Sequence, residues 1–146
     1  MQPRKRILIV EDSEDTRFVY AAILSLDGYD ILEAANGEAG VASALEYQPD
    51  LIITDINMPG LNGFDVARRL RADERTARTP IVAVTGTVFR AHENGMAESL
   101  FDSCFFKPMK PSEVLQEVRR LLNSGAESEK RFTAEGAEGV AEGAED

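Results

Sequence analysis

The sequence predicts an α/β fold in which helices cover both faces of a five-stranded parallel sheet. Short apolar runs alternate with longer segments of helical periodicity, at about the spacing of βα units. The runs at residues 7–10, 51–54 and 81–84 are almost entirely apolar, as strands buried on both faces are. Pro, Gly and Asx residues stand between the segments and mark turns. These three observations together favour a doubly wound sheet.

Boundary signals support the individual elements. Asp12 or Ser13 can cap the first helix and Asn36 the second, and Pro111 suits the first turn of the last helix. The fourth helix is the weakest, because Gly95 lies inside it. Strands are expected at Ile7–Val10, Tyr29–Ala34, Asp50–Thr54, Ile81–Thr85 and Cys104–Lys107. Helices are expected at Glu14–Leu26, Asn36–Tyr47, Phe64–Arg71, Phe89–Leu100 and Pro111–Leu122.

The composition of the strands predicts their order. The first, third and fourth strands are the most apolar and belong in the centre, whereas the second and fifth are mixed and suit the edges. Right-handed crossovers then give the order 2-1-3-4-5, with five helices on the two faces.

The chain divides into a domain at residues 1–124 and a tail at residues 125–146. Its net charge is −10, and residues 123–146 carry seven acidic and two basic residues, which give −5. Ala-Glu-Gly recurs three times after residue 133. This composition cannot bury a core, so we expect an acidic, Ala/Glu/Gly-rich disordered tail. The alternative is the beginning of a linker to an output domain.

Charge and apolar content also exclude several classes of partner. The negative charge argues against general binding of nucleic acid or anionic membrane. Arg68–Arg78 is rich in arginine, but in so acidic a chain it is better explained as a solvated face and loop. The apolar run after Arg6 is too short for an export signal, and a single cysteine, Cys104, indicates a reducing compartment. We therefore expect a cytoplasmic protein.

Chemically active side chains follow the strands of this predicted sheet. Strand ends carry Glu11 and Asp12, Asp55, Thr85 and Lys107, and ligands bind at the carboxyl ends of strands in open parallel sheets. Three carboxylates in one place repel one another unless a cation joins them, and all-oxygen ligands suit Mg²⁺. Asp55 could then attack phosphorus, with Mg²⁺, the ammonium and the hydroxyl meeting the new charge.

This set of residues resembles the receiver domain of two-component response regulators, a flavodoxin-like fold. The resemblance covers roughly Lys5 to Leu122 and includes the loop Met58-Pro59-Gly60 and Gly63. It implies that a histidine kinase or a histidine phosphotransfer protein phosphorylates Asp55. It also implies that Asp12, Asp55 and the carbonyl of Asn57 ligate Mg²⁺, that Glu11 helps through water, and that Lys107–Pro108 is a cis bond.

Two positions depart from the family pattern. The family usually has Tyr or Phe three residues before the lysine, as a rotating switch coupled to the threonine, and here that position is Cys104. Phe105 and Phe106 are near but out of register. A small residue is common where this chain has Leu100, near the turn into the fifth strand. The usual switch, in which an aromatic residue at position 104 is coupled to Thr85, therefore cannot form with Cys104 in that place.

The first helix offers a candidate docking surface. At 100° per residue, Val19, Ala22, Ile23 and Leu26 form the expected core stripe, which leaves the outer side and its margin to Phe18, Ala21 and Leu24. In the family this face meets the kinase. No DNA-binding segment follows Leu122, so we expect output by contact with a downstream protein, through the fourth helix, fifth strand and fifth helix, from a monomer or weak dimer.

Two other functions remain open at this point. A haloacid-dehalogenase-like phosphatase would also use Asp55 as a nucleophile, but it needs a second aspartate two residues later, where this chain has Asn57. A pseudo-receiver that only binds partners would not need the acidic set or Lys107. A protein that catalyses only its own phosphorylation and dephosphorylation fits the residues better than either.

Overall fold

The computed structural model describes residues 4–86, 100–107, 110–123 and 131–132. Its strands are β1 (Arg6–Val10), β2 (Asp30–Ala34), β3 (Leu51–Asp55), β4 (Ile81–Thr85), β5 (Ser103–Phe106) and β6 (Arg131–Phe132). Its helices are α1 (Glu14–Leu26), α2 (Gly37–Tyr47), α3 (Gly63–Arg71) and α6 (Pro111–Asn123). The helix expected at Phe89–Leu100 lies outside the described residues except for its last position.

All strand pairs are parallel, and the sheet order is β2-β1-β3-β4-β5-β6. The expected order of the first five strands is confirmed. The sixth strand was not expected, since it lies in the segment whose composition predicted a disordered tail. The rest of that segment falls outside the described residues, so the tail prediction itself stays open there.

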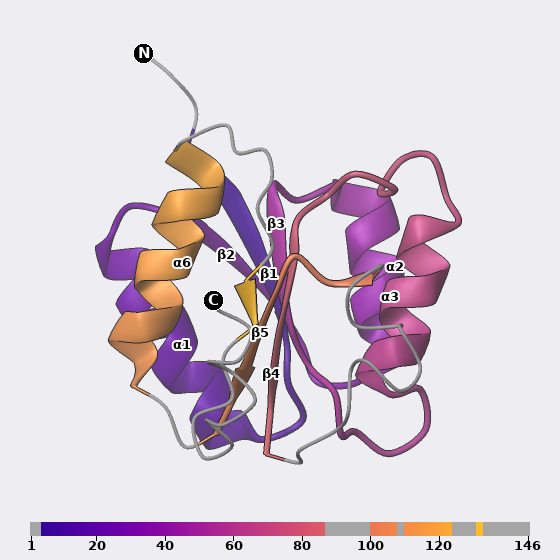
Figure 1. The fold of residues 1–146 in the computed structure, drawn as a ribbon, viewed down its shortest axis with the longest axis horizontal. Helices are drawn as coiled ribbons and strands as arrows, with labels where there is room; N and C mark the ends of the chain where they lie inside the picture. The colour runs from indigo at the N-terminus through magenta and orange to yellow at the C-terminus, as the bar shows by residue number, and fades with distance from the viewer. Residues whose placement is uncertain (1–3, 87–99, 108–109, 124–130, 133–146) are drawn as a thin grey trace.

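Two helical layers sandwich the sheet (Figure 1). On one face α1 and α6 pack against each other and cover a cluster that includes Ile9, Ile53 and Val84. On the other face α2 and α3 cover a cluster that includes Leu8, Ile52 and Ala83. Since successive strand residues point to opposite faces, the central strands contribute to both clusters, and this explains why their sequences are apolar without alternation.

Side-chain caps fix where the helices begin. Ser13 Oγ accepts a hydrogen bond from the amide of Thr16, and Asn36 Oδ1 accepts one from Ala39. Asn62 forms a reciprocal capping box with Asp65 at the start of α3. Each cap satisfies an amide that has no partner within the helix. Helix α1 follows directly on Glu11 and Asp12, and α3 follows the loop after Asp55, so these caps also border the candidate site.

The expected facing of α1 is wrong by part of a turn. Leu24, placed on the outer side by the sequence analysis, is completely buried, and Tyr20 is buried beside it. Val19 and Leu26, expected in the core, are exposed. Two apolar stripes of similar strength run along this helix, and the stripe with Tyr20 and Leu24, not the expected one with Val19 and Leu26, faces the core. Phe18 is 70% exposed, as expected, and Ala21 is partly buried.

Candidate functional site

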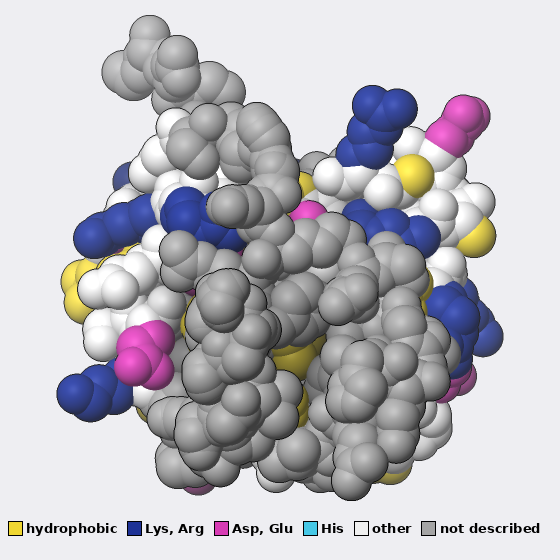
Figure 2. Space-filling view, in the orientation of Figure 1, with side chains coloured by type: hydrophobic (Ala, Val, Ile, Leu, Met, Phe, Trp, Pro, Cys, Tyr) yellow, Lys and Arg dark blue, Asp and Glu magenta, His cyan; other side chains and the backbone are white. Residues whose placement is uncertain are grey.

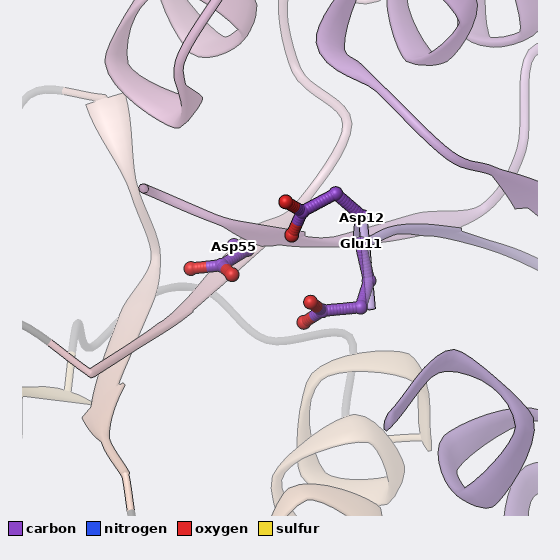
Figure 3. A group of neighbouring side chains, drawn as sticks. All are labelled: Glu11, Asp12 and Asp55. Atoms are coloured by element: carbon purple, nitrogen blue, oxygen red, sulfur yellow. The ribbon is translucent and has the colours of Figure 1, made fainter. Parts of the chain in front are cut away.

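The strand pairing brings two carboxylates together. Ile9 of β1 lies opposite Ile53 of β3 in the ladder, so Glu11 and Asp55, each two residues further on, continue the same face of the sheet at its carboxyl end. Asp12 follows directly. One carboxylate oxygen from each of these three acids lies within 4.8 Å of the others, and the three side chains converge in Figure 3. The predicted acidic cluster is therefore present.

The backbone of the loop that follows β3 holds the Asp55 side chain in place. Its Oδ1 accepts a hydrogen bond of 3.2 Å from the amide of Asn57. The following loop turns through Gly60, whose φ of 79° favours glycine, and closes where the amide of Gly63 donates to the carbonyl of Ile56 at 2.9 Å. A Cβ at Gly63 would lie 2.4 Å from the Asp55 carbonyl oxygen. This loop thus needs glycine to pass so close to the strand end.

Lys107 reaches the two buried acids from the end of β5. Its Nζ lies 3.4 Å from Asp55 Oδ2 and 3.3 Å from Glu11 Oε1, and its side chain is only 29% exposed. Its backbone amide donates to the Thr85 carbonyl at 2.7 Å, which continues the β4–β5 ladder past the strand. The ammonium group therefore bridges Glu11 and Asp55 without covering either completely.

Glu11 occupies a buried position that disfavours its charge. Burial raises the pKa of its carboxyl group, and the neighbouring charge of Asp55 raises it further. The Ser13 amide, which donates to Oε2 at 3.0 Å, and the Lys107 ammonium both act in the opposite direction. Asp12, in contrast, is exposed. The cluster therefore combines two buried carboxylates with one that solvent reaches.

Thr85 and Asn57 form a second, hydrogen-bonded layer of the site. Thr85 is completely buried, and its Oγ1 accepts a hydrogen bond of 3.1 Å from Asn57 Nδ2. The amide of Asn57 contacts Asp55 while its side chain contacts Thr85. Sequence analysis assigned only the carbonyl of Asn57, so this link between β3 and β4 was missed. An Asn two residues after a strand-end Asp is its only sequence signal.

Position 104 is occupied by a buried thiol. Cys104 lies opposite Ala83 and is fully buried among the side chains under α2 and α3, and burial raises its pKa to about 12. A thiol with so high a pKa is a packing residue rather than a reactive one. Phe106, on the same face, lies directly opposite Thr85 in the ladder. The aromatic side chain adjacent to Thr85 in the ladder is therefore Phe106, two residues after the expected switch position.

Two residues of α1 also reach this region and were not singled out from the sequence. Arg17 donates to the Glu11 carbonyl oxygen at 2.8 Å and pairs with Glu33 at 3.0 Å. Tyr20 is buried, and its pKa is raised to about 12 by burial and then by the charges of Glu11 and Asp55. Arg17 thus fixes the backbone between β1 and α1, and the buried Tyr20 lies close enough to the acid pair for both charges to act on its hydroxyl group.

The donor set fits a hard divalent cation. Three carboxylates and one ammonium leave about two negative charges within the described part of the site. Mg²⁺ prefers carboxylate oxygens, retains several waters and tolerates an open side. The exposed carboxylate of Asp12 provides that open side. The buried carboxylates of Glu11 and Asp55 carry negative charge that the single ammonium group of Lys107 does not fully neutralise. These residues are therefore suited to hold Mg²⁺.

A family model with the description response regulator receiver domain matches residues 7–119. The chain belongs to the response regulator receiver domain family. The matched span includes β1 from its second residue, β2 to β5, most of α6 and every acidic residue of the site. The family resemblance on which the sequence analysis relied is confirmed.

Curated relatives of this receiver domain include longer proteins. The DNA-binding dual master transcriptional regulator RpaA of Synechocystis sp. is 38% identical over 117 residues, which are 80% of this chain and 48% of RpaA. Protein PilH of Pseudomonas aeruginosa is 45% identical over 80 residues, which are 55% of this chain and 66% of PilH. The chain thus spans about half the length of RpaA and just under two thirds of PilH.

Solved receiver structures share the fold. The receiver domain of sensor histidine kinase PA1611 from Pseudomonas aeruginosa, with a magnesium ion coordinated in its active site cleft, has a TM-score of 0.75 at 30% identity. The match covers 84% of this chain and 100% of the PA1611 receiver chain. Chemotaxis protein CheY4 of Vibrio cholerae has a TM-score of 0.74 at 27% identity, covering 82% of this chain and all of its own.

Other surfaces of the receiver domain are less distinctive. Among the described helices, none is long and apolar enough to span a bilayer. The arginine-rich stretch is largely paired with acids: Arg68 lies 2.7 Å from Asp65, and Arg75 lies 2.9 Å from Asp73. In Figure 2, Lys and Arg side chains stand over both α6 and α3 rather than in one block. The stretch is thus a paired, solvated surface, as the sequence indicated.

Proposed function

We propose that this receiver domain accepts a phosphoryl group on Asp55 from a phosphohistidine, in a Mg²⁺-dependent reaction, and signals the change to a protein partner. The donor would be a sensor histidine kinase or a histidine phosphotransfer protein. The observation that carries the proposal is the position of Asp55, a buried carboxylate beside Glu11, Asp12 and Lys107. Membership of the family supports it.

The chemistry follows from the nucleophile and its neighbours. A carboxylate oxygen of Asp55 attacks phosphorus while the bond from phosphorus to the imidazole nitrogen breaks, and that nitrogen keeps the electron pair. The Lys107 ammonium, already within 3.4 Å of Asp55, stabilises charge on the transferred phosphoryl oxygens. The Thr85 hydroxyl can donate to the same oxygens. Bound Mg²⁺, held by Asp12, Asp55 and the Asn57 carbonyl with Glu11 behind them, would neutralise further negative charge.

The same residues would return the protein to its starting state. Attack of water on phosphorus releases phosphate and regenerates the Asp55 carboxylate, so the protein catalyses only its own phosphorylation and dephosphorylation. Asn57 and Lys107 border the phosphoryl position on two sides. Such a protein carries a signal and turns over no metabolite. The proposed place of action is the cytoplasm, where the kinase domains that carry phosphohistidine act.

Phe18 is the best-placed residue for docking the phosphodonor protein. Its side chain is 70% exposed on α1, the helix that follows Glu11 and Asp12. Ala21 is partly buried beside it, and Leu24 is withdrawn from this role because it is buried. Phe18→Glu should slow transfer from the cognate kinase and leave phosphorylation by a small donor unchanged. Equal slowing with both donors would show that the substitution acts on the site and not on docking.

Intact-mass measurement tests the function directly. The protein is incubated with Mg²⁺ and a small acyl phosphate or phosphoramidate, and its mass is recorded over time. One added phosphoryl group, absent in Asp55→Asn and absent when EDTA replaces Mg²⁺, is the expected result. Repeated turnover of phosphomonoesters would instead indicate a phosphatase. No mass change under any condition would indicate a domain that only binds partners.

A further inference from the structure

The edge of β5 carries an additional strand supplied by the end of the chain. Residues 131–132 form β6, which pairs in parallel with β5, Ser103 opposite Arg131 and Cys104 opposite Phe132. Figure 1 shows it as a short arrow beside β5. Without it, β5 would be the outermost strand on that side of the described sheet, with a row of backbone groups open to pairing.

The sequence around β6 differs from the rest of the C-terminal segment. Among residues 124–146, Lys130 and Arg131 are the only basic residues and Phe132 the only aromatic one. The remaining positions are mainly Ala, Gly, Ser and Glu, which are poor strand formers. The pairing therefore includes Phe132, which belongs to the one pair of adjacent strand-forming residues in the segment, Phe132 and Thr133. The local composition thus agrees with the backbone pairing of β6.

Chain geometry makes this pairing easy to reach. α6 runs back across the sheet from the end of β5, and its 13 residues span roughly 20 Å. Its last residue, Asn123, thus lies toward the end of the sheet where β5 begins. Seven residues, 124–130, connect it to β6, and seven extended residues reach about 23 Å. A tether of this length gives an effective local concentration on the order of millimolar.

The same geometry makes the pairing weak. β6 has two residues. The step from β1 to β2 crosses the face of α1 toward one side of the sheet, and the step from β5 to β6 crosses that same face toward the other side. Since the first crossover has the usual right hand, the second is left-handed, which parallel sheets strongly disfavour. A short strand on a disfavoured crossover is held mainly by its tether.

We propose that Arg131–Phe132 is a tethered, displaceable strand that closes the β5 edge of this receiver domain. A partner that adds an extended segment to this edge must first displace it, so the chain regulates access to its own sheet. The closed edge includes Cys104, three residues before Lys107. The proposal does not depend on phosphoryl transfer, because it rests on strand pairing and chain length alone.

Hydrogen exchange in the full-length chain tests the pairing. In the double variant Arg131→Pro/Phe132→Pro, residues 131 and 132 lose the N–H groups that donate to β5. A two-residue pair without its donors should detach, so the β5 amides also lose their carbonyl acceptors on β6. The segment Phe101–Lys107 should then exchange faster by roughly one or two amides, those that pointed toward β6. The matched control, Ala134→Pro/Gly136→Pro, places two prolines just beyond the strand and should exchange like the parent chain. Identical exchange in all three proteins would overturn the proposal.

A competition experiment tests displacement. A synthetic peptide with the sequence of residues 129–134 is titrated to about ten times the millimolar effective concentration of the tether, into the parent chain and the 131/132 proline variant. The backbone amide resonances of Ser103 and Cys104 are followed by NMR. The peptide should shift these resonances in the variant and at least severalfold less in the parent, where the tethered strand competes. Equal shifts in both proteins, or no shift in the variant, would contradict a displaceable strand.

Discussion

At the amino end of the sheet every N–H of the Arg71 guanidinium has an acceptor, whereas at the carboxyl end three clustered carboxylates have one ammonium group beside them, which contacts two of them. Arg71 donates to the carbonyls of Ala77, Thr79 and Leu100 and pairs with Asp102 at 3.1 Å. Asp102 in turn accepts from the amide of Ile81 at 2.9 Å. This network joins the end of α3 to the beginnings of β4 and β5.

The difference separates a structural role from a functional one. The partly buried charge of Arg71 has one acidic partner and several carbonyls, so the network needs nothing further to be satisfied. Glu11, Asp12 and Asp55 have only Lys107 as a cation within the described residues. A fold retains such an imbalance where a ligand completes it. Breaking either end should therefore affect different quantities: stability at the amino end, and chemistry at the carboxyl end.

The largest expected effect is on chemistry, from Lys107→Ala. Removing the ammonium should slow phosphorylation of Asp55 by a small donor about 100- to 1,000-fold, the usual cost of losing one group that stabilises developing charge. The fold should persist, because the substitution keeps the backbone amide of residue 107, which donates to the Thr85 carbonyl. The rate is measured by intact mass and stability by urea unfolding. A rate within a few-fold of the parent would mean that Lys107 has no part in transfer.

Arg71→Ala should have the opposite profile. Leaving Asp102 and three carbonyls without their donor should lower the free energy of unfolding by about 2–4 kcal/mol. The phosphorylation rate of the folded fraction should stay near that of the parent. Arg69→Ala, at an exposed neighbouring position, is the control and should cost less than about 0.5 kcal/mol. If Arg71→Ala slowed phosphorylation as strongly as Lys107→Ala, the proposed division between the two ends would be wrong.

Gly63→Ala should affect both quantities, since it acts on the backbone that carries Asp55. The new methyl group would lie 2.4 Å from the Asp55 carbonyl oxygen and must displace the loop. We expect a loss of about 1–3 kcal/mol in unfolding free energy and slower phosphorylation. Gly86→Ala is the matched control, because its nearest neighbour is Lys107 Cδ at 4.0 Å. A fully stable, fully active Gly63→Ala protein would show that the loop is not tightly constrained.

Mg²⁺ should give the smallest effect, a gain in stability. At a concentration tenfold above its dissociation constant, binding to the folded state alone adds about 1.4 kcal/mol to the unfolding free energy. Asp12→Asn should remove most of this gain, whereas Asp15→Asn, at an exposed position in the first turn of α1, should retain it. Thermal unfolding with Mg²⁺ or EDTA provides the measurement. Equal gains in all three proteins would place the bound ion elsewhere.

Much of the fold and site was predictable from the sequence, because both depend on local signals that agree. Apolar strand runs fixed the sheet order, and strand ends in parallel sheets meet at one edge, so the convergence of Glu11, Asp55 and Lys107 follows from topology. The buried face of α1 was predicted wrongly, because Leu24 and Leu26 are equally apolar and only tertiary packing decides which of them is buried. Periodicity alone cannot separate two stripes of similar strength.

The features that sequence could not predict depend on contacts between distant segments. The hydrogen bond from Asn57 to Thr85 and the network around Arg71 join residues about 30 positions apart, and neither has a spacing rule. The strand β6 was hidden by the composition of its neighbours, because a window over the acidic segment averages out two strand-forming residues. Short pairings of this kind depend on an available edge, which only the assembled sheet provides.

The most direct test of the central claim is to locate the phosphoryl group chemically. After incubation with Mg²⁺ and a small phosphodonor, borohydride reduction converts an aspartyl phosphate to homoserine, and peptide mass spectrometry then identifies the modified residue. Homoserine at position 55, formed only with Mg²⁺ and lost in Lys107→Ala at short times, is the expected result. Modification at another residue, or at position 55 without any divalent cation and independently of Lys107, would contradict the account.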